Sequence, residues 1–173
     1  MIRIETSRLI MQQISENEWP LFQNLHQDED VIRYAFDKPS VQEIRERFES
    51  RLPEWKWGST HWLCLVIKDK KSKECIGITG LVISEKSGHT VEVGYLLKKA
   101  FHGQGYGTES LVGLIEHTQE NYPVSEINAI VTDGNLPSCK LLEKAGFVLV
   151  ERESDAYQIG NKLYDDLIYR YAV

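Results

Sequence analysis

The stretch TVEVGYLLKKAFHGQGYGTESLVGLIEHTQEN, residues 90–121, decides the fold because it carries a strand, a glycine-rich loop and a helix in direct succession. Residues Thr90 to Leu97 form a β-rich run that is typical of a strand. From Gly105 to about Asn121 the apolar residues recur at helical spacing, which predicts a helix. The predicted apolar face of that helix consists of Leu111, Leu114, Ile115 and Thr118.

Two further β-rich runs precede this unit. They span His61 to Lys68 and Cys75 to Ser84, and the polar turn Asp69 to Lys73 separates them. The pair Ser87–Gly88 then separates the second run from the strand Thr90 to Leu97. Short polar turns between neighbouring strands predict an antiparallel meander.

The N-terminal part predicts one strand and two helices. The short apolar stretch Leu9 to Ile14 is a candidate strand. Ser15 opens an S-x-x-E capping box, so a helix is predicted to start there and to run to about Gln27. The same signal at Ser40 predicts a second helix, which Pro53 ends.

The C-terminal part continues the alternation of strands and helices. Glu126 to Val131 is a predicted strand, and Leu136 to Ala145 a predicted helix closed by Gly146 at the C′ position. Phe147 to Arg152 and Leu163 to Tyr171 are two final predicted strands.

In chain order the predicted elements are β-α-α-β-β-β-α-β-α-β-β. This order belongs to the α/β (α+β) fold class, with helices packed on a mixed sheet. The chain shows no internal repeat and no Pro/Gly/Ser linker, so we expect residues 1–173 to form a single domain.

Composition excludes several classes of protein. The net charge of −6 argues against non-specific nucleic-acid binding, which needs clustered Lys and Arg. The three cysteines, Cys64, Cys75 and Cys139, are odd in number and lack C-x-x-C spacing, so we expect free thiols and no metal site. The N-terminus has no apolar signal-peptide core, and no run is long enough to span a bilayer. These features predict a cytoplasmic protein without membrane contact.

The loop FHGQGYGT, residues 101–108, is a candidate phosphate site. It follows a strand and opens a helix, where unpaired N–H groups and the helix dipole favour an anion such as a diphosphate. The alternative is a turn that needs glycine for its geometry alone. Neither a Walker A motif nor the G-x-G-x-x-G fingerprint fits, because Thr108 stands in place of the third glycine. A nucleotide-dependent dehydrogenase is therefore disfavoured.

Four motifs in this order carry a family resemblance: VEVGYLL (91–97), HGQGYGTE (102–109), NLPS (135–138) and KAGF (144–147). The chain resembles the GNAT superfamily of acetyl-CoA-dependent N-acetyltransferases, and within it the RimJ/RimL-type ribosomal-protein N-terminal acetyltransferases. The opening ETSRL (5–9) and the closing YDDLIY (164–169) are similar too, so the resemblance spans essentially the whole chain.

The resemblance implies a mostly antiparallel central sheet flanked by helices, and acetyl-CoA as the cofactor. It also implies that the strands Thr90 to Leu97 and Glu126 to Val131 splay apart around the pantetheine arm, with the backbone of Val93 and Gly94 polarising the thioester. A glycine in mid-strand also suggests a bulge or a close backbone approach. The implied cofactor-binding residues are Val93, Gly94, Tyr95, His102, Gly103, Gln104, Gly105, Tyr106, Gly107, Thr108 and Asn135. The superfamily has Gln or Arg where this chain has His102, so that side chain is expected to be an exposed loop histidine.

Glu92 is the candidate general base, and its alternative is an exposed strand carboxylate. Strand alternation places Glu92 and Gly94 on one face of the sheet and the flanking valines on the other. Ser138 is the candidate general acid or hydrogen-bond donor near the departing sulfur. Asn135 and Ser138 also fit the cap of the following helix. Cys139 is expected to be a core cysteine.

The acceptor is expected to be a primary amine, foremost the N-terminal α-amine of a ribosomal protein. An α-amine suits a single moderate base better than lysine does, because its pKa is about 8 against about 10.4. A polyamine, an amino acid and an aminoglycoside remain alternatives, as does a non-catalytic acyl-CoA-binding module on the same fold. The tryptophans Trp55, Trp57 and Trp62 line an acceptor groove in one interpretation and pack in the core in the other.

Overall fold

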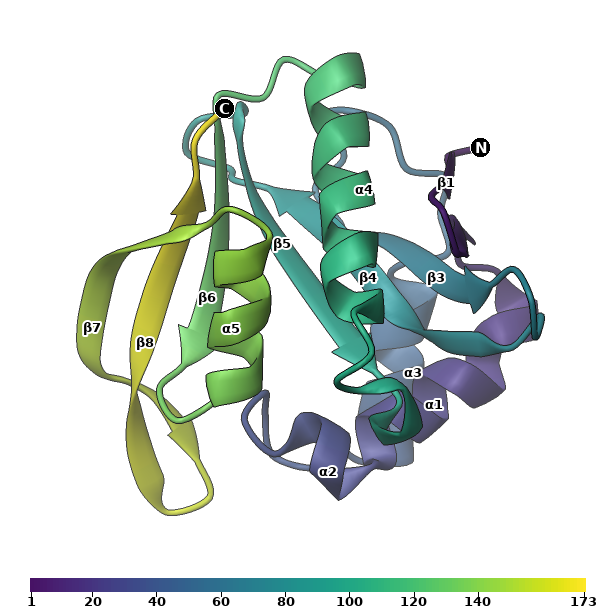
Figure 1. The fold of residues 1–173 in the computed structure, drawn as a ribbon. Coiled ribbons are helices and arrows are strands. Elements are labelled where there is room, and N and C mark those ends of the chain that lie inside the picture. Colours follow the sequence, from purple (N-terminus) through teal and green to yellow (C-terminus); the bar gives the residue numbers. More distant parts are fainter.

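Eight strands form one mixed sheet in the order β1-β2-β3-β4-β5-β6-β8-β7 in this computed structural model, which describes residues 1–173 (Figure 1). Every neighbouring pair is antiparallel except β5 with β6. The strands are β1 (Arg3–Glu5), β2 (Leu9–Gln13), β3 (Leu63–Asp69), β4 (Cys75–Ile83), β5 (Thr90–Leu97), β6 (Glu126–Thr132), β7 (Val148–Ile159) and β8 (Lys162–Tyr171). The mostly antiparallel sheet expected from the resemblance is confirmed.

Helices cover both faces of this sheet. The helical elements are η1 (Glu16–Glu18), α1 (Trp19–Gln27), α2 (Glu29–Ile32), α3 (Val41–Glu49), η2 (Lys99–Phe101), α4 (Tyr106–Asn121) and α5 (Leu136–Lys144). In Figure 1, α4 and α5 lie in front of the sheet, and α1 and α3 lie behind it.

Two hydrophobic cores correspond to these two layers. The larger core joins α4 and α5 to one face of the sheet, and the smaller core joins α1 and α3 to the other face. Leu111 and Leu114 of α4 are fully buried in the larger core, as the helical spacing predicted, and Phe22 and Phe48 are fully buried in the smaller one. Apolar periodicity therefore assigned α4 correctly, and the helices predicted from capping and C′ signals, which are α1, α3 and α5, are present as well.

Short or polar elements differ from the prediction. The strand β1 and the helix α2 were missed, because β1 buries only Ile4 and α2 only Ile32. The capping box at Ser15 does form, but it encloses the 3-10 turn η1, and Pro20 then lies at the start of α1. The strand β7 runs on to Ile159 because it pairs with β8 in a long hairpin whose side chains are mostly exposed.

The strands β5 and β6 pair over a short distance only. Their ladder joins residues Thr90–Glu92 to Glu126–Asn128, and beyond it the two strands diverge towards α2 (Figure 1). The segment after α2 bridges the opening at its far end. The ring of Tyr34 packs edge-on against the ring of Tyr164, with 6.3 Å between the ring centroids. The splayed pair of strands expected from the resemblance is thus present.

Other expectations concern cysteines and metals. Cys64 and Cys139 are buried, Cys75 is half-buried, and all three are free thiols. No three His, Cys, Asp or Glu side chains gather in a way that could hold a metal ion. None of the helices combines the length and the apolar character that a bilayer crossing requires.

Candidate active site

The loop between η2 and α4 presents its backbone N–H groups without protein partners. Gly103 and Gly105 adopt left-handed φ angles of 71° and 81°, which non-glycine residues rarely adopt. The first backbone bond of α4 is donated by the Glu109 amide to the Gly105 carbonyl. No protein atom accepts a hydrogen bond from the amides of residues 103–108. Such a row of free donors at a helix N-terminus suits a diphosphate.

The side chains of this loop fold back onto the protein. The exposed His102 donates from Nε2 to the Leu97 carbonyl at 2.8 Å, and Gln104 donates from Nε2 to the Ala100 carbonyl at 2.8 Å. The Tyr106 hydroxyl lies 3.4 Å from Asp69 Oδ1. The groups of this loop that stay free for a ligand are therefore mainly backbone amides. His102 is an exposed loop histidine, as expected.

Gly107 has a different reason to be glycine. A Cβ atom at this position would lie 2.4 Å from Leu141 Cδ1 and 2.9 Å from Leu97 Cδ1. The missing side chain lets α4 pack closely against α5 and β5. The glycines of the loop thus divide into two that permit an unusual backbone and one that permits close packing.

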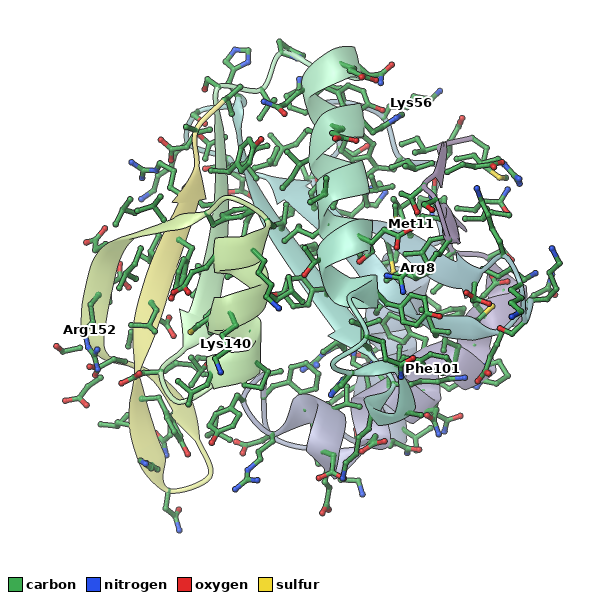
Figure 2. All side chains as sticks on the ribbon, viewed as in Figure 1. Arg8, Met11, Lys56, Phe101, Lys140 and Arg152 are labelled. Atoms are coloured by element: carbon green, nitrogen blue, oxygen red, sulfur yellow. The ribbon has the colours of Figure 1, made fainter.

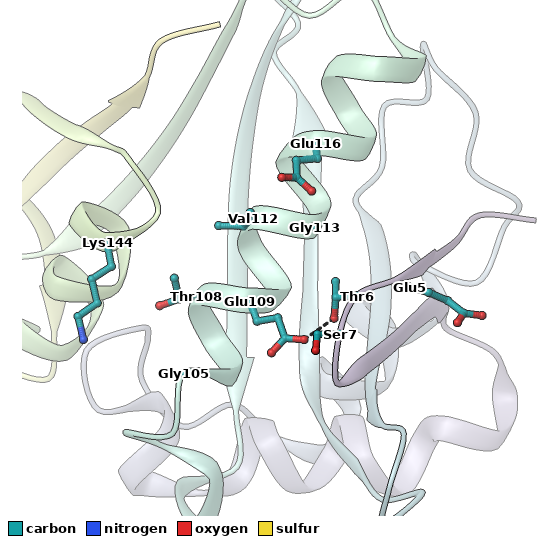
Figure 3. Close-up of a pocket in the computed structure, with 10 residues that line it drawn as sticks. All are labelled: Glu5, Thr6, Ser7, Gly105, Thr108, Glu109, Val112, Gly113, Glu116 and Lys144. Carbon is teal, nitrogen blue, oxygen red and sulfur yellow. Dashed lines mark hydrogen bonds between the residues drawn. The ribbon is translucent and has the colours of Figure 1, made fainter.

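A groove of about 550 Å³ runs along the first turns of α4 (Figure 3). Its lining residues are Glu5, Thr6, Ser7, Gly105, Thr108, Glu109, Val112, Gly113, Glu116 and Lys144. Figure 3 shows Lys144 on α5 across from Thr108, away from the carboxylates on the other flank. Lys144 is the one cationic side chain that lines this groove, so an anion held by the loop would have this cation on the α5 side.

The strand β5 places its residues as alternation predicted. Val91 and Val93 are buried in the larger core, while Glu92 and Gly94 are half-buried on the opposite face. The expected bulge at Gly94 is wrong, because the ladder with β4 pairs Gly94 with Gly80 without a register shift. Gly94 is closely approached, and the atoms that approach it belong to a side chain. A Cβ at Gly94 would lie 3.3 Å from the indole of Trp62.

Glu92 lies at the point where β5 and β6 part. It is opposite Asn128 in the last paired position of the two strands. Burial raises the pKa of the Glu92 carboxyl above its usual range, and the negative charge of Asp166 raises it further. We call the place where the β5–β6 ladder ends the seam of the sheet. A carboxylate with a raised pKa at this seam is suited to accept a proton.

Ser138 and Tyr95 meet across the gap between α5 and β5. Ser138 Oγ lies 2.6 Å from the Tyr95 hydroxyl. Burial raises the pKa of Tyr95 to about 12, so its phenol stays protonated. Asn135 caps α5, because its side-chain oxygen accepts from the Ser138 amide at 3.4 Å. No local sequence pattern predicts this hydrogen bond, because its two residues are 43 positions apart.

The three tryptophans do not form one group. Trp55 is buried and forms an aromatic cluster with Trp57 and Tyr122 near the far end of α4, so for these two the core interpretation is correct. Only Trp62 lies at the seam, over Gly94. The guanidinium of Arg51 lies 6.0 Å from the Trp62 ring. The acceptor-groove interpretation therefore stays open for Trp62 alone.

Comparisons with known sequences bear on this arrangement. A sequence model of the acetyltransferase (GNAT) domain matches residues 8–148. The uncharacterized N-acetyltransferase YjdG of Bacillus subtilis (strain 168) is 26% identical over 162 residues, which cover 90% of this chain and 95% of the relative. The uncharacterized N-acetyltransferase p20 of Bacillus licheniformis is 24% identical over 149 residues, covering 85% and 83% respectively.

Solved structures share the fold. A RimL ribosomal L7/L12 α-N-protein acetyltransferase in complex with coenzyme A superimposes with a TM-score of 0.86 at 18% identity, over 99% of this chain and 98% of that one. A spermidine N-acetyltransferase from Vibrio cholerae, in complex with CoA and spermine, gives a TM-score of 0.83 at 16% identity, over 96% of each chain.

Proposed function

The chain belongs to the GNAT family of acetyltransferases and is an acetyl-CoA-dependent N-acetyltransferase, and from this premise we propose that its acceptor is the N-terminal α-amine of a protein, foremost a ribosomal protein. The likeness to the RimL structure supports this acceptor. The observation that carries the proposal is Glu92, a half-buried carboxylate with a raised pKa in the last paired position before β5 and β6 part.

The residues of the loop fit the diphosphate of coenzyme A. The amides of residues 103–108 have no acceptor in the protein, and the left-handed Gly103 has no heavy atom within 4 Å of its Cβ position. Beyond the paired end of the strands, the edge of β5 at Val93 and Gly94 is free of β6 and suits the pantetheine amides. When bound, coenzyme A supplies an activated thioester, so the protein has to contribute orientation and proton handling.

Glu92 is the proposed general base. An α-amine with a pKa of about 8 loses its proton near neutral pH at a cost of roughly 1.4 kcal/mol, whereas lysine costs roughly 3 kcal/mol more. The amine nitrogen then forms its bond to the thioester carbonyl carbon, and Glu92 accepts the proton that this nitrogen releases. A moderate base of this kind suits an α-amine better than a lysine side chain.

Tyr95 and Ser138 are proposed to stabilise the leaving sulfur. As the carbon–sulfur bond breaks, negative charge develops on the thiolate. A phenol with a pKa of about 12 is a weaker acid than a thiol with a pKa of about 8.5, so complete proton transfer would be uphill by roughly 5 kcal/mol. The pair therefore acts by donating a hydrogen bond to the thiolate, which takes its proton from solvent afterwards.

An amine panel tests the acceptor, with release of the free CoA thiol as the readout. The panel contains peptides with ribosomal-protein N-termini, the same peptides with blocked N-termini, spermidine, free amino acids and an aminoglycoside. We expect the free N-terminal peptides to give the highest kcat/KM and the blocked peptides to give none. A preference for spermidine would overturn the proposed acceptor and would favour the polyamine alternative, which the likeness to the Vibrio cholerae enzyme supports.

A further inference from the structure

Arg8, which is far from the glycine-rich loop in sequence, donates a hydrogen bond to the backbone of that loop. Arg8, just before β2, donates from Nη1 to the Gln104 carbonyl at 3.0 Å. Its guanidinium carbon lies 4.2 Å from the centroid of the Tyr106 ring. Figure 2 shows Arg8 beside the start of α4, on the same side of the molecule as Phe101. We propose that Arg8 is a positioning residue that aims the loop amides at the diphosphate of acetyl-CoA.

The peptide geometry explains how one contact can aim the loop. In a trans peptide the C=O of one residue and the N–H of the next point in opposite directions. When Arg8 holds the Gln104 carbonyl, the Gly105 N–H must point away from Arg8. This N–H is one of the loop donors without a protein acceptor. The inference rests on the proposed function, in which those donors bind the diphosphate.

Glu109, in the first turn of α4, fixes the position of Arg8. Its carboxylate accepts from Arg8 Nε at 2.6 Å, from the Arg8 amide at 2.7 Å and from the Thr6 hydroxyl at 2.6 Å. Figure 3 shows the contact between Thr6 and Glu109. The side chain of Glu109 is 18% exposed, so this ion pair is better shielded from solvent than the other ion pairs of the chain.

The backbone around Arg8 is held as well. Its carbonyl accepts from the Lys70 amide at 2.8 Å, and Lys70 Nζ donates to the Thr6 carbonyl at 2.5 Å. The arginine is thus bound to both the β3–β4 turn and α4, and its contacts with the Gln104 carbonyl and the Tyr106 ring connect these elements to the loop. A cation so placed also adds positive potential behind the donors that face the anion.

The test compares two acetyl donors that differ in the diphosphate. One is acetyl-CoA and the other is S-acetylpantetheine, which ends before the phosphates. For Arg8→Met we expect the KM for acetyl-CoA to rise by about tenfold with kcat changed by less than about twofold, because the tail is still positioned once bound. We expect kcat and KM with S-acetylpantetheine to stay at the wild-type values. A general loss of structure would lower activity with both donors alike.

Two further variants complete the test. Arg3→Met is the matched control, since Arg3 pairs only with the exposed Glu5, and it should leave both donors unaffected. Arg8→Lys keeps the charge but cannot reach Glu109 and Gln104 together, so its KM for acetyl-CoA should fall between wild type and Arg8→Met. It also carries the test if Arg8→Met does not fold.

The outcomes separate the inference from the proposed function. Wild-type enzyme that uses both donors with equal KM would overturn the diphosphate site itself, and this inference with it. Wild-type enzyme that prefers acetyl-CoA, together with an Arg8→Met or Arg8→Lys variant of unchanged KM, would overturn the role of Arg8 alone. An equal loss with both donors would assign Arg8 to folding.

Discussion

At the scale of single residues, Glu92 leads to a prediction about pH. A base works in its deprotonated form, so kcat/KM should fall as the pH drops through the pKa of Glu92, which burial and then Asp166 raise. Glu92→Gln should lower kcat/KM by about 10²- to 10⁴-fold, the usual contribution of a general base, and should remove the part of the acidic limb that belongs to Glu92, leaving the limb of the acceptor amine. The measurement is the pH profile of kcat/KM with a peptide acceptor.

Asp166→Asn provides the control for that profile. Without the negative charge of Asp166 the pKa of Glu92 should move back towards its usual value, so the acidic limb should shift to lower pH. An unshifted limb would mean that another group titrates there. Activity of Glu92→Gln equal to wild type would remove Glu92 from the mechanism.

Tyr95 and Ser138 should behave as one unit. Tyr95→Phe and Ser138→Ala each remove one partner of the 2.6 Å hydrogen bond. We expect each variant to lower kcat by about 10- to 100-fold, which is at or below the usual loss when a transition-state hydrogen-bond donor is removed. The KM for acetyl-CoA should change little. The double variant should lose little more than either single one, because groups acting together are not additive. Additive losses would show that the two hydroxyls act separately.

At the scale of elements, Gly107 is predicted to matter for helix packing. Gly107→Ala would push a methyl group against Leu141 and Leu97, the residues that bring α5 and β5 next to α4. Overpacking of this kind costs about 1–3 kcal/mol, because side chains must leave their preferred rotamers. In a chain of this length that corresponds to a melting temperature lower by about 2–12 °C, measured by calorimetry. Gly88→Ala is the comparison: no heavy atom lies within 4 Å of its Cβ position, so any loss there comes from its left-handed φ of 67° and not from overpacking.

Elements with regular apolar periodicity could be predicted from the sequence, and elements without it could not. The bounds of β5 match the prediction, and those of α4 differ by one residue, because Val91, Val93 and Leu111 mark buried faces. The four-residue α2 has too few residues to show a period. The exposed strand β7 has no buried face, so nothing in its composition announces that it continues past Arg152.

The site was predictable to the extent that backbone and strand alternation define it. Alternation placed Glu92 and Gly94 on one face, and the glycine pattern located the loop with its free amides. The pairing of Tyr95 with Ser138 and the hold of Arg8 on the loop depend on side chains that meet only after folding. The parting of β5 from β6 came from the family resemblance, since no residue pattern specifies where a ladder ends.

At the scale of the whole molecule, the short ladder between β5 and β6 is a seam. On one side lie β1 to β5, and on the other lie β6 to β8. Besides the ladder from Thr90 to Glu92, the two parts share the larger hydrophobic core, which includes the packing of α4 on α5 at Gly107. Three contacts also cross the opening: the hydrogen bond between Tyr95 and Ser138, the ring contact between Tyr34 and Tyr164, and the Asp37 carboxylate, which accepts from the Gly160 amide at 2.7 Å. A ligand that lies between the parted strands would therefore add contacts to both parts where the ladder itself is absent.

This arrangement predicts that coenzyme A stabilises the whole chain. A ligand present at a hundred times its Kd adds about 2.7 kcal/mol to the free energy of unfolding, provided that it binds only the folded state. For a chain of this length the melting temperature should rise by about 5–11 °C. Pantetheine at the same concentration should raise it much less, because it lacks the diphosphate for which the amides of residues 103–108 are free. Calorimetry with coenzyme A, pantetheine and no ligand measures the difference. An equal rise with both ligands would place the binding energy in the strands rather than in the loop, and no rise with coenzyme A would mean that the free amides and the parted strands do not form its site.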